Sequence, residues 1–585
     1  MRTSDLRELA RSYGVQLSYE DAGGKRREPS RDALEAVLRK RLPEGLSLDE
    51  ALERKRRGVA EEPPVLVAWD GKFDRGPEEV VLEEGAPWNG RGRLPLGYHH
   101  RGDTLIISAP RRAHELPRKT WGAFLPLYAA HTSARPEGDL GVLERYLQWI
   151  QSAGGGLVAT LPLLAQFDDE PSPYSPVSRL FWNERYLDVE KLPEYRGERG
   201  PKAEILAACA ERFQPDDGFA SHAKEAGDYA RFRGDERYHL YVQYRMKQQM
   251  QAMSDAARRA GPGLYLDFPL GVNGGGYDVQ RYRESFAGGV SVGAPPDLFF
   301  TKGQNWGFPP FHPDGLRERR YDYFIAAVRN HAAHAGILRL DHVMGLHRLY
   351  WIPEGAEAKD GVYVRYPEEE LYAILTLESR RNGCALVGED LGTVPEYVPR
   401  MMEKHGLRRM YVVQYEIKPQ QPPLAEPPRQ SVASVNTHDM PTFAGFWREQ
   451  DVDDRVEQEL LDEDGANEER ETRAKMRAAL SRYVRAREED EPHVLEGVLG
   501  ALARSDAEVV LVNLEDLWGE TRPQNVPGVP ERSWRQKFRL SLEEAQRDAR
   551  VQRVLAAVNE GRGGARASRN REAEHEQRRD DEARQ

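Results

Sequence analysis

The chain has 585 residues, of which 39% are hydrophobic, and it carries a formal net charge of -12. This length predicts a large domain with smaller ones attached, and the acidic balance without a long basic stripe argues against nucleic acid as the main partner. Two cysteines, Cys209 and Cys384, exclude a disulfide framework; together with the lack of a signal-peptide core and of any apolar run of about 18 residues, they predict a cytoplasmic protein that binds no membrane.

The N-terminal part of the chain divides into two patterns. Residues 1–62 repeat apolar side chains at helical spacing, as in Leu6, Leu9 and Ala10, and predict an N-terminal helical region. Residues 63–114 change to short alternating runs with glycine-rich turns, which predict a small β domain.

Residues 115–562 alternate strand-like runs with longer helical patterns. The seven runs are Leu157–Leu163, Leu264–Leu270, Ile337–Leu340, Ala385–Val387, Met410–Tyr415, Ser431–Val435 and Val509–Leu514. Most are continuously apolar, as strands of a parallel sheet buried on both faces must be. The pattern predicts an α/β fold, a catalytic (β/α)₈ TIM barrel with inserted subdomains. We place the eighth strand near Ser175–Asn183.

Two further segments are rich in charge. Residues 449–490 predict exposed helix or loop inserted in the barrel. Residues 563–585 contain almost no apolar side chains, so they predict a disordered charged tail.

Two acidic residues follow predicted strands in the way that cleavage of a glycosidic bond requires. Such cleavage uses one protonated and one ionised carboxyl group, and barrels carry catalytic groups at the C-terminal ends of strands. Asp341 ends one run, and Arg339 on the same face would keep it ionised, as a nucleophile must be. Glu389 ends another beside a hydrophobic slot, which would raise its pKa for a general acid. A structural salt bridge and a helix cap are the alternatives.

A third acid, Asp439, ends the strand-like segment Ser434–Asp439, and His438 beside it could also bind sugar hydroxyls. An N-cap is the alternative for Asp439, because Met440, Pro441 and Thr442 resemble a helix start. A metal site is disfavoured because no partner ligands stand at a useful spacing.

Aromatic residues near these acids could stack on sugar faces, although core packing is the alternative for each of them. They are Trp306, Phe308, Phe311, Tyr350 and Trp351. The chain has no GxGxxG, P-loop lysine, CxxC or HExxH motif. We therefore expect no organic cofactor and no catalytic metal.

Seven segments together resemble one known family. In chain order they are Ser172–Ser178 with Asn183, Gly293–Asp297, Gly303–Gly307, Arg339–His342, Glu389–Gly392, Thr437–Asp439, and Asn525–Gly528 with Trp534. The set is similar to the 4-α-glucanotransferases (amylomaltases or disproportionating enzymes) of glycoside hydrolase family 77, and most similar to their longer bacterial form.

The resemblance implies transfer of α-1,4-glucan segments to a sugar 4-hydroxyl by a retaining double displacement, with maltooligosaccharides and other α-1,4-glucans as substrates. By motif match, Asp341 is the nucleophile, Glu389 the general acid and base, and Asp439 the group that stabilises the transition state. The resemblance also implies substrate-binding residues: Arg339, His438, Tyr174, Trp306, Asp297, Asn183 and His342.

Two departures from the short family members leave the acceptor side open. Val343-Met344 and Met440-Pro441 stand where those members carry other pairs, and both look like the long bacterial type. Two other functions remain as alternatives: a retaining α-glucan hydrolase that uses the same carboxylates, and a non-catalytic glucan-binding protein. The sequence is silent on the oligomeric state.

Overall fold

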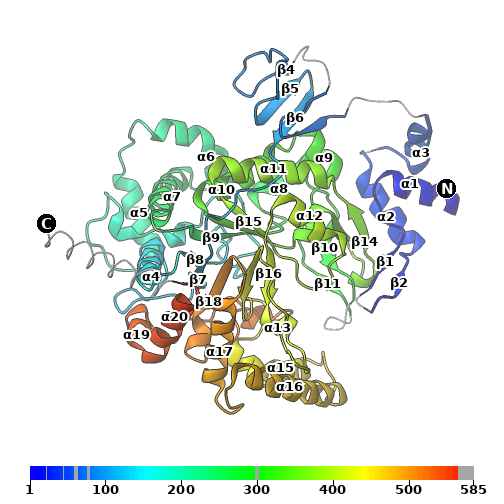
Figure 1. Ribbon diagram of the computed structural model, residues 1–585. Helices are drawn as coiled ribbons and strands as arrows, with labels where there is room; N and C mark the ends of the chain where they lie inside the picture. The colour runs from blue at the N-terminus through cyan, green and yellow to red at the C-terminus, as the bar shows by residue number, and fades with distance from the viewer. Residues whose placement is uncertain (22, 44, 58–62, 75–79, 297–301, 564–585) are drawn as a thin grey trace, which may run out of the picture.

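The structure is a computed structural model that describes residues 1–563, except residues 22, 44, 58–62, 75–79 and 297–301 (Figure 1). Two sequence predictions lie outside the described residues: the substrate-binding role of Asp297 and the disordered tail beyond residue 563.

An eight-stranded parallel sheet forms the centre of the molecule, as predicted for a (β/α)₈ barrel (Figure 1). Its strands are β7 (Thr120–Phe124), β8 (Leu157–Ala159), β9 (Gly263–Phe268), β12 (Ile337–Leu340), β15 (Ala385–Gly388), β16 (Arg409–Val412), β17 (Ser431–Ser434) and β18 (Val509–Asn513). The last strand, β18, pairs in parallel with the first, β7. Between β15 and β16 a parallel bridge from Val387 to Arg408 closes the ring.

The predicted eighth strand at Ser175–Asn183 is wrong, because β7 takes that place and residues 175–183 form a loop. One antiparallel bridge, from Leu164 to Trp182, and side chains hold this loop. Asp278 accepts hydrogen bonds from the Ser178 hydroxyl at 2.6 Å and the Arg179 amide at 2.7 Å. The sequence patterns did not predict β7, because Gly122 interrupts its apolar run. A Cβ on Gly122 would lie 2.3 Å from the Leu157 carbonyl oxygen, so the neighbouring strand requires glycine there.

Apolar side chains fill the barrel interior. The cluster contains Leu157, Ala159, Tyr265, Ile337, Ala385, Val387, Val432, Val509 and Leu511. Successive inward positions on a strand are two residues apart, so the inward set of β12 runs from Ile337 through Arg339 to Asp341. The core is therefore apolar in its lower layers and polar at its C-terminal mouth, where barrel enzymes carry their sites.

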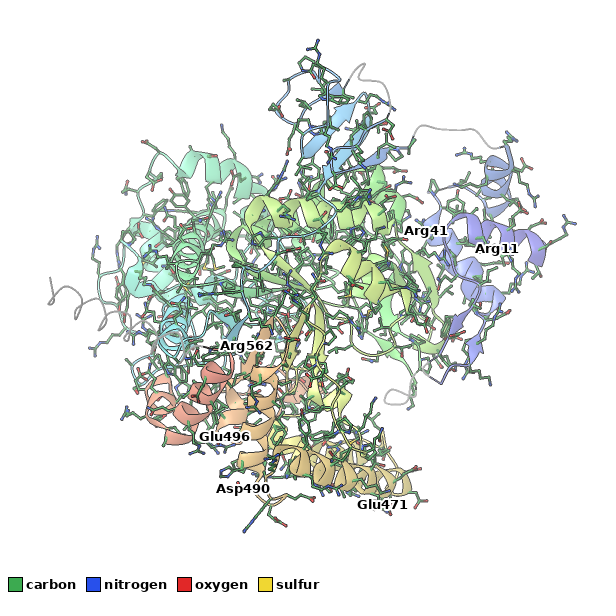
Figure 2. All side chains as sticks on the ribbon, viewed as in Figure 1. Arg11, Arg41, Glu471, Asp490, Glu496 and Arg562 are labelled. Carbon is green, nitrogen blue, oxygen red and sulfur yellow. The ribbon has the colours of Figure 1, made fainter. Side chains whose placement is uncertain are left out.

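Insertions surround that mouth. Strands β10 (Val290–Ala294), β11 (Gln304–Asn305), β13 (Arg348–Pro353) and β14 (Val362–Arg365) form an antiparallel sheet in the order β11-β10-β13-β14. Helices α5 (Lys202–Arg212), α6 (Phe219–Arg233) and α7 (Glu236–Ala257) lie between β8 and β9. Helices α15 (Gln450–Glu457), α16 (Glu463–Val484) and α17 (Glu491–Arg504) follow β17, and Glu471 and Glu496 lie on this outer layer (Figure 2).

The residues before the barrel form two further groups of elements. Helices α1 (Thr3–Ser12), α2 (Arg31–Arg41) and α3 (Leu48–Arg57), with a hairpin of β1 (Tyr19–Glu20) and β2 (Arg26–Arg27), lie beside the antiparallel sheet. A second sheet has the order β3-β6-β5-β4, with β3 (Val65–Trp69), β4 (Val80–Val81), β5 (Gly97–Arg101) and β6 (Thr104–Ala109). The division into domains at residues 62 and 114 stays a prediction.

The part of the chain that the structure describes contains no helix with the length and apolar character needed to cross a bilayer.

At the other end of the barrel from the mouth, Arg562 donates hydrogen bonds to the carbonyl oxygens of Thr120 and Glu508, at the starts of β7 and β18 (Figure 2).

Candidate active site

The predicted acids follow three strands of the barrel. Arg339 of β12 pairs with Val387 of β15, and Leu340 with Gly388. Asp341 and Glu389 are the next residues on these strands and hold equivalent positions. Neighbouring strands lie about 4.8 Å apart, so both carboxyl groups start from adjacent backbone at the barrel mouth. Asp439 belongs to the loop after β17.

The Asp341 carboxyl group lies beside a buried guanidinium, that of Arg339. Its Oδ1 lies 3.0 Å from Nη1 of Arg339, and its side chain keeps 23% of its surface exposed. The same Nη1 donates at 2.8 Å to both oxygens of Asp267, which faces Arg339 from β9. Arg339 is therefore fixed between two carboxylates, and Asp341 keeps access to the mouth.

Glu389 is surrounded differently. Its Oε2 accepts a hydrogen bond from the His342 amide at 2.9 Å, and its Oε1 accepts one from the Leu391 amide at 2.7 Å. Burial, with a further contribution from the charge of Asp341, raises the pKa of Glu389 to about 7 although Arg339 acts against the shift. The two amides fix the carboxyl plane, so Glu389 can hold or release a proton near neutral pH in one orientation.

Asp439 is held by two neighbours. Nε2 of His438 lies 3.1 Å from its Oδ2, and the Asn525 amide group donates to its Oδ1 at 2.7 Å. Burial acts to raise the pKa, but His438 and Asn525 outweigh it and lower the pKa of Asp439 to about 2. Its side chain is 46% exposed, so an ionised carboxylate faces the open cleft. It caps no helix: Thr442 caps α14 (Phe443–Trp447) instead.

Stacked rings and hydrogen bonds connect Asp439 with Asp341. The His438 ring lies between Phe124, at 6.0 Å between centroids, and Tyr174, at 5.1 Å. The Tyr174 hydroxyl donates to Asp267 Oδ2 at 2.6 Å. Since Asp267 also holds Arg339, and Arg339 holds Asp341, one contiguous network joins the mouth-side ends of β9, β12 and β17. The structure thus brings Asp341, Glu389, Asp439 and their predicted supports together.

Trp306 and His342 lie at the rim of this cluster. Their ring centroids are 5.2 Å apart in an edge-to-face arrangement. His342 adopts a left-handed backbone with φ of 47°, and its amide donates to Glu389 Oε2 at 2.9 Å. Burial lowers the pKa of His342 to about 4, so its ring is neutral at pH 7 and can donate or accept a hydrogen bond.

A cavity of about 360 Å³ opens beside Asp439. Its apolar lining includes Met440, Pro441, Phe446, Leu460, Met476 and Val526. Its charged rim is already paired within the protein, since Arg473 lies 3.0 Å from Asp451 and 2.9 Å from Glu469. Apolar faces bordered by fixed polar groups are typical of a sugar-binding cleft.

Asn183, predicted to bind substrate, has local partners instead. Its side chain accepts a hydrogen bond from the Arg185 amide and donates to Gln166 at 3.1 Å. Gln166 in turn donates to the Ser172 carbonyl at 2.7 Å, in the loop that presents Tyr174. A contact of Asn183 with sugar stays a prediction.

Two residues of the site escaped the sequence reasoning. Asp267 is the single acid inside the predicted strand Leu264–Leu270, and a charge in a buried strand is a signal that it has a partner. Asn525 begins one of the seven segments, but its spacing along the chain gives no sign that it reaches Asp439, which lies 86 residues earlier.

A search of the described residues for three or more His, Cys, Asp or Glu side chains placed to hold a metal ion finds none. That no cofactor is required stays a prediction.

Comparison with known proteins gives consistent matches. The family described as 4-alpha-glucanotransferase, glycoside hydrolase family 77, matches residues 125–232 and 211–542. A 4-alpha-glucanotransferase of Mycobacterium tuberculosis (strain ATCC 25618 / H37Rv) is 31% identical over 549 residues, covering 76% of each chain. One of Haemophilus influenzae is 26% identical over 589 residues, covering 80% of this chain and 84% of the relative.

Solved structures give the same result. The amylomaltase of Corynebacterium glutamicum matches with a TM-score of 0.84 and 25% identity, over 95% of this chain and 100% of that one. The amylomaltase of Streptococcus agalactiae in complex with acarbose shares the fold at a TM-score of 0.63 and 18% identity, over 76% of this chain and 99% of that one.

Proposed function

The chain belongs to the 4-alpha-glucanotransferases of glycoside hydrolase family 77, an enzyme family that transfers α-glucan segments, and we propose that Asp341, Glu389 and Asp439 perform this transfer by a retaining double displacement. One observation carries the assignment of roles. Asp341 and Glu389 follow paired residues on neighbouring strands, yet one lies beside a fixed guanidinium and the other has a pKa raised to about 7. A retaining displacement requires two neighbouring carboxyl groups, one protonated and the other ionised.

In the first step, an oxygen of Asp341 attacks the anomeric carbon of the donor. The bond from that carbon to the leaving 4-oxygen breaks, and Glu389 gives its proton to this oxygen, which leaves as a 4-hydroxyl. A covalent glycosyl ester on Asp341 and an ionised Glu389 result. The register of β12 and β15 supports this retaining geometry, whose carboxyl groups are about 5–5.5 Å apart, over the wider spacing of inverting enzymes.

In the second step, Glu389 takes the proton of an acceptor 4-hydroxyl. The freed oxygen attacks the same carbon, the ester bond breaks, and Asp341 is released as a carboxylate. The α configuration is restored after two inversions. Both steps use Glu389 at the same place, which the His342 and Leu391 amides keep fixed.

Asp439 has the role of stabilising the positive charge that develops on the sugar ring. Its low pKa keeps it ionised, and its exposed oxygens can accept hydrogen bonds from ring hydroxyls. Trp306 and Tyr174 are the proposed stacking surfaces, and the cavity beside Asp439 has room for part of a glucan chain. Maltooligosaccharides and other α-1,4-glucans are therefore the proposed substrates. The buried, unpaired Cys209 and Cys384 support a reducing, cytoplasmic location.

Product analysis with maltotriose tests transfer against its rival, hydrolysis. A transferase converts maltotriose into glucose and a series of longer oligomers, because a sugar 4-hydroxyl captures the ester. If glucose and maltose alone appeared, water would be the acceptor and the enzyme would be a hydrolase with the same carboxylates.

A further inference from the structure

Two buried acids, Glu515 and Asp516, lie next to the network that holds Asp439. They belong to α18 (Leu514–Leu517), directly after β18, and their exposed fractions are 2% and 3%. Neither has a role in the displacement described above. Burying two carboxyl groups is unfavourable unless their oxygens accept hydrogen bonds. The hydrogen-bond donors to Glu515 and Asp516 therefore show which segments of the chain these acids position.

Asp516 fastens the loop that carries His438 and Asp439. Its Oδ1 accepts a hydrogen bond from the Phe443 amide at 2.7 Å and one from the Asn436 side chain at 3.3 Å. Asn436 stands just before His438, and Phe443 stands four residues after Asp439. One carboxyl oxygen therefore anchors the loop at both ends.

Glu515 fastens the segment that reaches Asp439 from the other side. Gln524 donates to its Oε2 at 2.7 Å and accepts a hydrogen bond from the Tyr128 hydroxyl at 2.7 Å. The next residue, Asn525, donates to Asp439 Oδ1. The Gln524 carbonyl also accepts a hydrogen bond from the Trp534 amide at 2.7 Å, and the Trp534 ring lies 5.9 Å from that of His438. The hydrogen bonds of Gln524 therefore also position Asn525 against Asp439 and Trp534 against His438.

The protonation of the two acids fits this role. Burial raises the pKa of Glu515 to about 8 and that of Asp516 to about 7. A carboxyl group that is largely neutral can stay buried without a cation and still accept hydrogen bonds through its carbonyl oxygen. Among the described residues, Oδ2 of Asp516 has no hydrogen-bond partner, so the contacts to the loop are concentrated on Oδ1.

We propose that Glu515 and Asp516 are positioning residues for Asp439: from the end of β18 they hold the 436–443 loop and the 524–525 segment in the one arrangement that presents the Asp439 carboxylate to the sugar. The proposal rests on the role of Asp439 stated under the proposed function. Neither acid reaches the substrate, so each acts through other residues. A displacement of about 1 Å in such a supporting shell can lower turnover by about 100-fold.

A double-mutant cycle tests this proposal, because residues that act through one another are not additive. The variants are Asp516→Ala, Asp439→Asn and the two combined, assayed with maltotriose and with an α-glucosyl fluoride donor. We expect Asp516→Ala to lower kcat/KM by about 10- to 100-fold in the otherwise unchanged enzyme. In the Asp439→Asn background the same change should lower it by less than about threefold. Asp516→Asn keeps an oxygen acceptor for Phe443 and should restore most of the activity.

The matched control is Glu194→Ala. Glu194 is another buried acid, which accepts a hydrogen bond from the Tyr241 hydroxyl at 2.9 Å in the insertion between β8 and β9. Its removal should lower thermal stability while kcat/KM stays within about threefold in both backgrounds. If Asp516→Ala does not yield folded enzyme, Glu515→Ala replaces it and should give the same non-additive result through Gln524 and Asn525.

Equal losses in the two backgrounds, or an Asp516→Ala enzyme as active as the unchanged one, would overturn the proposal. Its failure is distinguishable from failure of the proposed function. If Asp439→Asn alone kept full activity, the role of Asp439 would be wrong. If Asp439→Asn were strongly impaired but still measurable and the cycle were additive, only the positioning role would be wrong.

Discussion

Asp341 and Glu389 show how environment separates two chemically similar groups. They occupy equivalent positions on neighbouring strands, and each side chain begins at the same height in the barrel. Asp341 lies beside Nη1 of Arg339, whereas Glu389 accepts hydrogen bonds from two backbone amides. A guanidinium favours the carboxylate, and burial favours the acid. The proposed division of roles therefore follows from the Arg339 contact of Asp341 and from the raised pKa of Glu389.

Substituting each acid should separate these roles. Asp341→Asn removes the nucleophile, so turnover should fall by at least about 10⁴-fold with every donor. Glu389→Gln removes the proton donor and the later base. With an α-glucosyl fluoride, which departs with little protonation, the first step should still proceed and the second should stall. Mass spectrometry of Glu389→Gln should then find the glycosyl adduct on the peptide that contains Asp341.

An adduct found on a peptide containing Glu389 or Asp439, in an otherwise active enzyme, would contradict this assignment of roles. Asp341→Asn treated with the same donor is the control, because it should carry no adduct.

The pH dependence of kcat/KM should report Glu389. The first step needs a protonated acid, and burial raises the pKa of this group to about 7. We expect kcat/KM for maltotriose to fall by about tenfold per pH unit above that value. Asp439, with a pKa lowered to about 2, stays ionised over the assay range and sets no limit there.

The matched measurement of the same profile uses α-glucosyl fluoride, for which the alkaline decline should largely vanish. An identical decline for both donors, or its persistence in Glu389→Gln, would assign it to another group.

Much of the site could be predicted from single residues. An acid after an apolar run predicts a strand end, and Asp341 and Glu389 do directly follow β12 and β15, whereas Asp439 lies five residues beyond the end of β17. Asp267 was missed because its partner Arg339 lies 72 residues away on another strand, and only the register of β9 against β12 connects them. Asn525 was missed for the same reason. Local patterns give the position of a side chain on its own element, but contacts between elements depend on the order and register of strands.

At the level of elements, the same limit explains the strand that was misplaced. Seven strands have enough branched and apolar residues to be recognised, whereas β7 contains Gly122 and was not. Residues 175–183 contain buried side chains such as Val177 without a strand's ladder. Buried character alone therefore predicts that a segment enters the core, and the hydrogen-bond partners of its backbone decide whether it is a strand.

Helix α11 (Glu368–Asn382) is the element on which the small N-terminal sheet depends. Its Glu378 is buried and accepts hydrogen bonds from the Tyr98 hydroxyl at 2.9 Å and from Arg329 at 2.8 and 3.1 Å. Glu378→Ala leaves a buried hydroxyl and a guanidinium without their partner. We expect a loss of about 2–4 kcal/mol in the free energy of unfolding, measured by chemical denaturation, with kcat unchanged.

Glu368→Ala is the control on the same helix. Glu368 is exposed in the first turn of α11, so its removal should cost less than about 1 kcal/mol. Equal losses for the two variants would contradict the importance of the buried contact.

At the scale of the whole molecule, the proposed catalytic groups make no contact with the N-terminal elements among the contacts described above. The contacts described for Asp341, Glu389 and Asp439 all come from residues after 112. The segment after α1 instead contacts the inserted sheet: the Gln16 backbone amide donates to the Tyr363 carbonyl at 2.8 Å, and Arg348 donates to the Gln16 side chain at 3.0 Å. Trp306 directly follows β11 of this same sheet, so these contacts connect the N-terminal residues with the sheet that presents Trp306.

Removal of residues 1–112 tests that arrangement. The shortened chain loses the contacts of Gln16 with the inserted sheet and of Tyr98 with Glu378, so its thermal unfolding should begin at a lower temperature. At saturating maltotriose we expect kcat to stay within about threefold, because no catalytic group is removed. KM should rise, because the sheet that presents Trp306 loses its support. A circular dichroism spectrum of the shortened chain is the control for folding. A chain that is folded by this measure and yet shows no turnover at saturating substrate would mean that the first 112 residues contribute to catalysis itself.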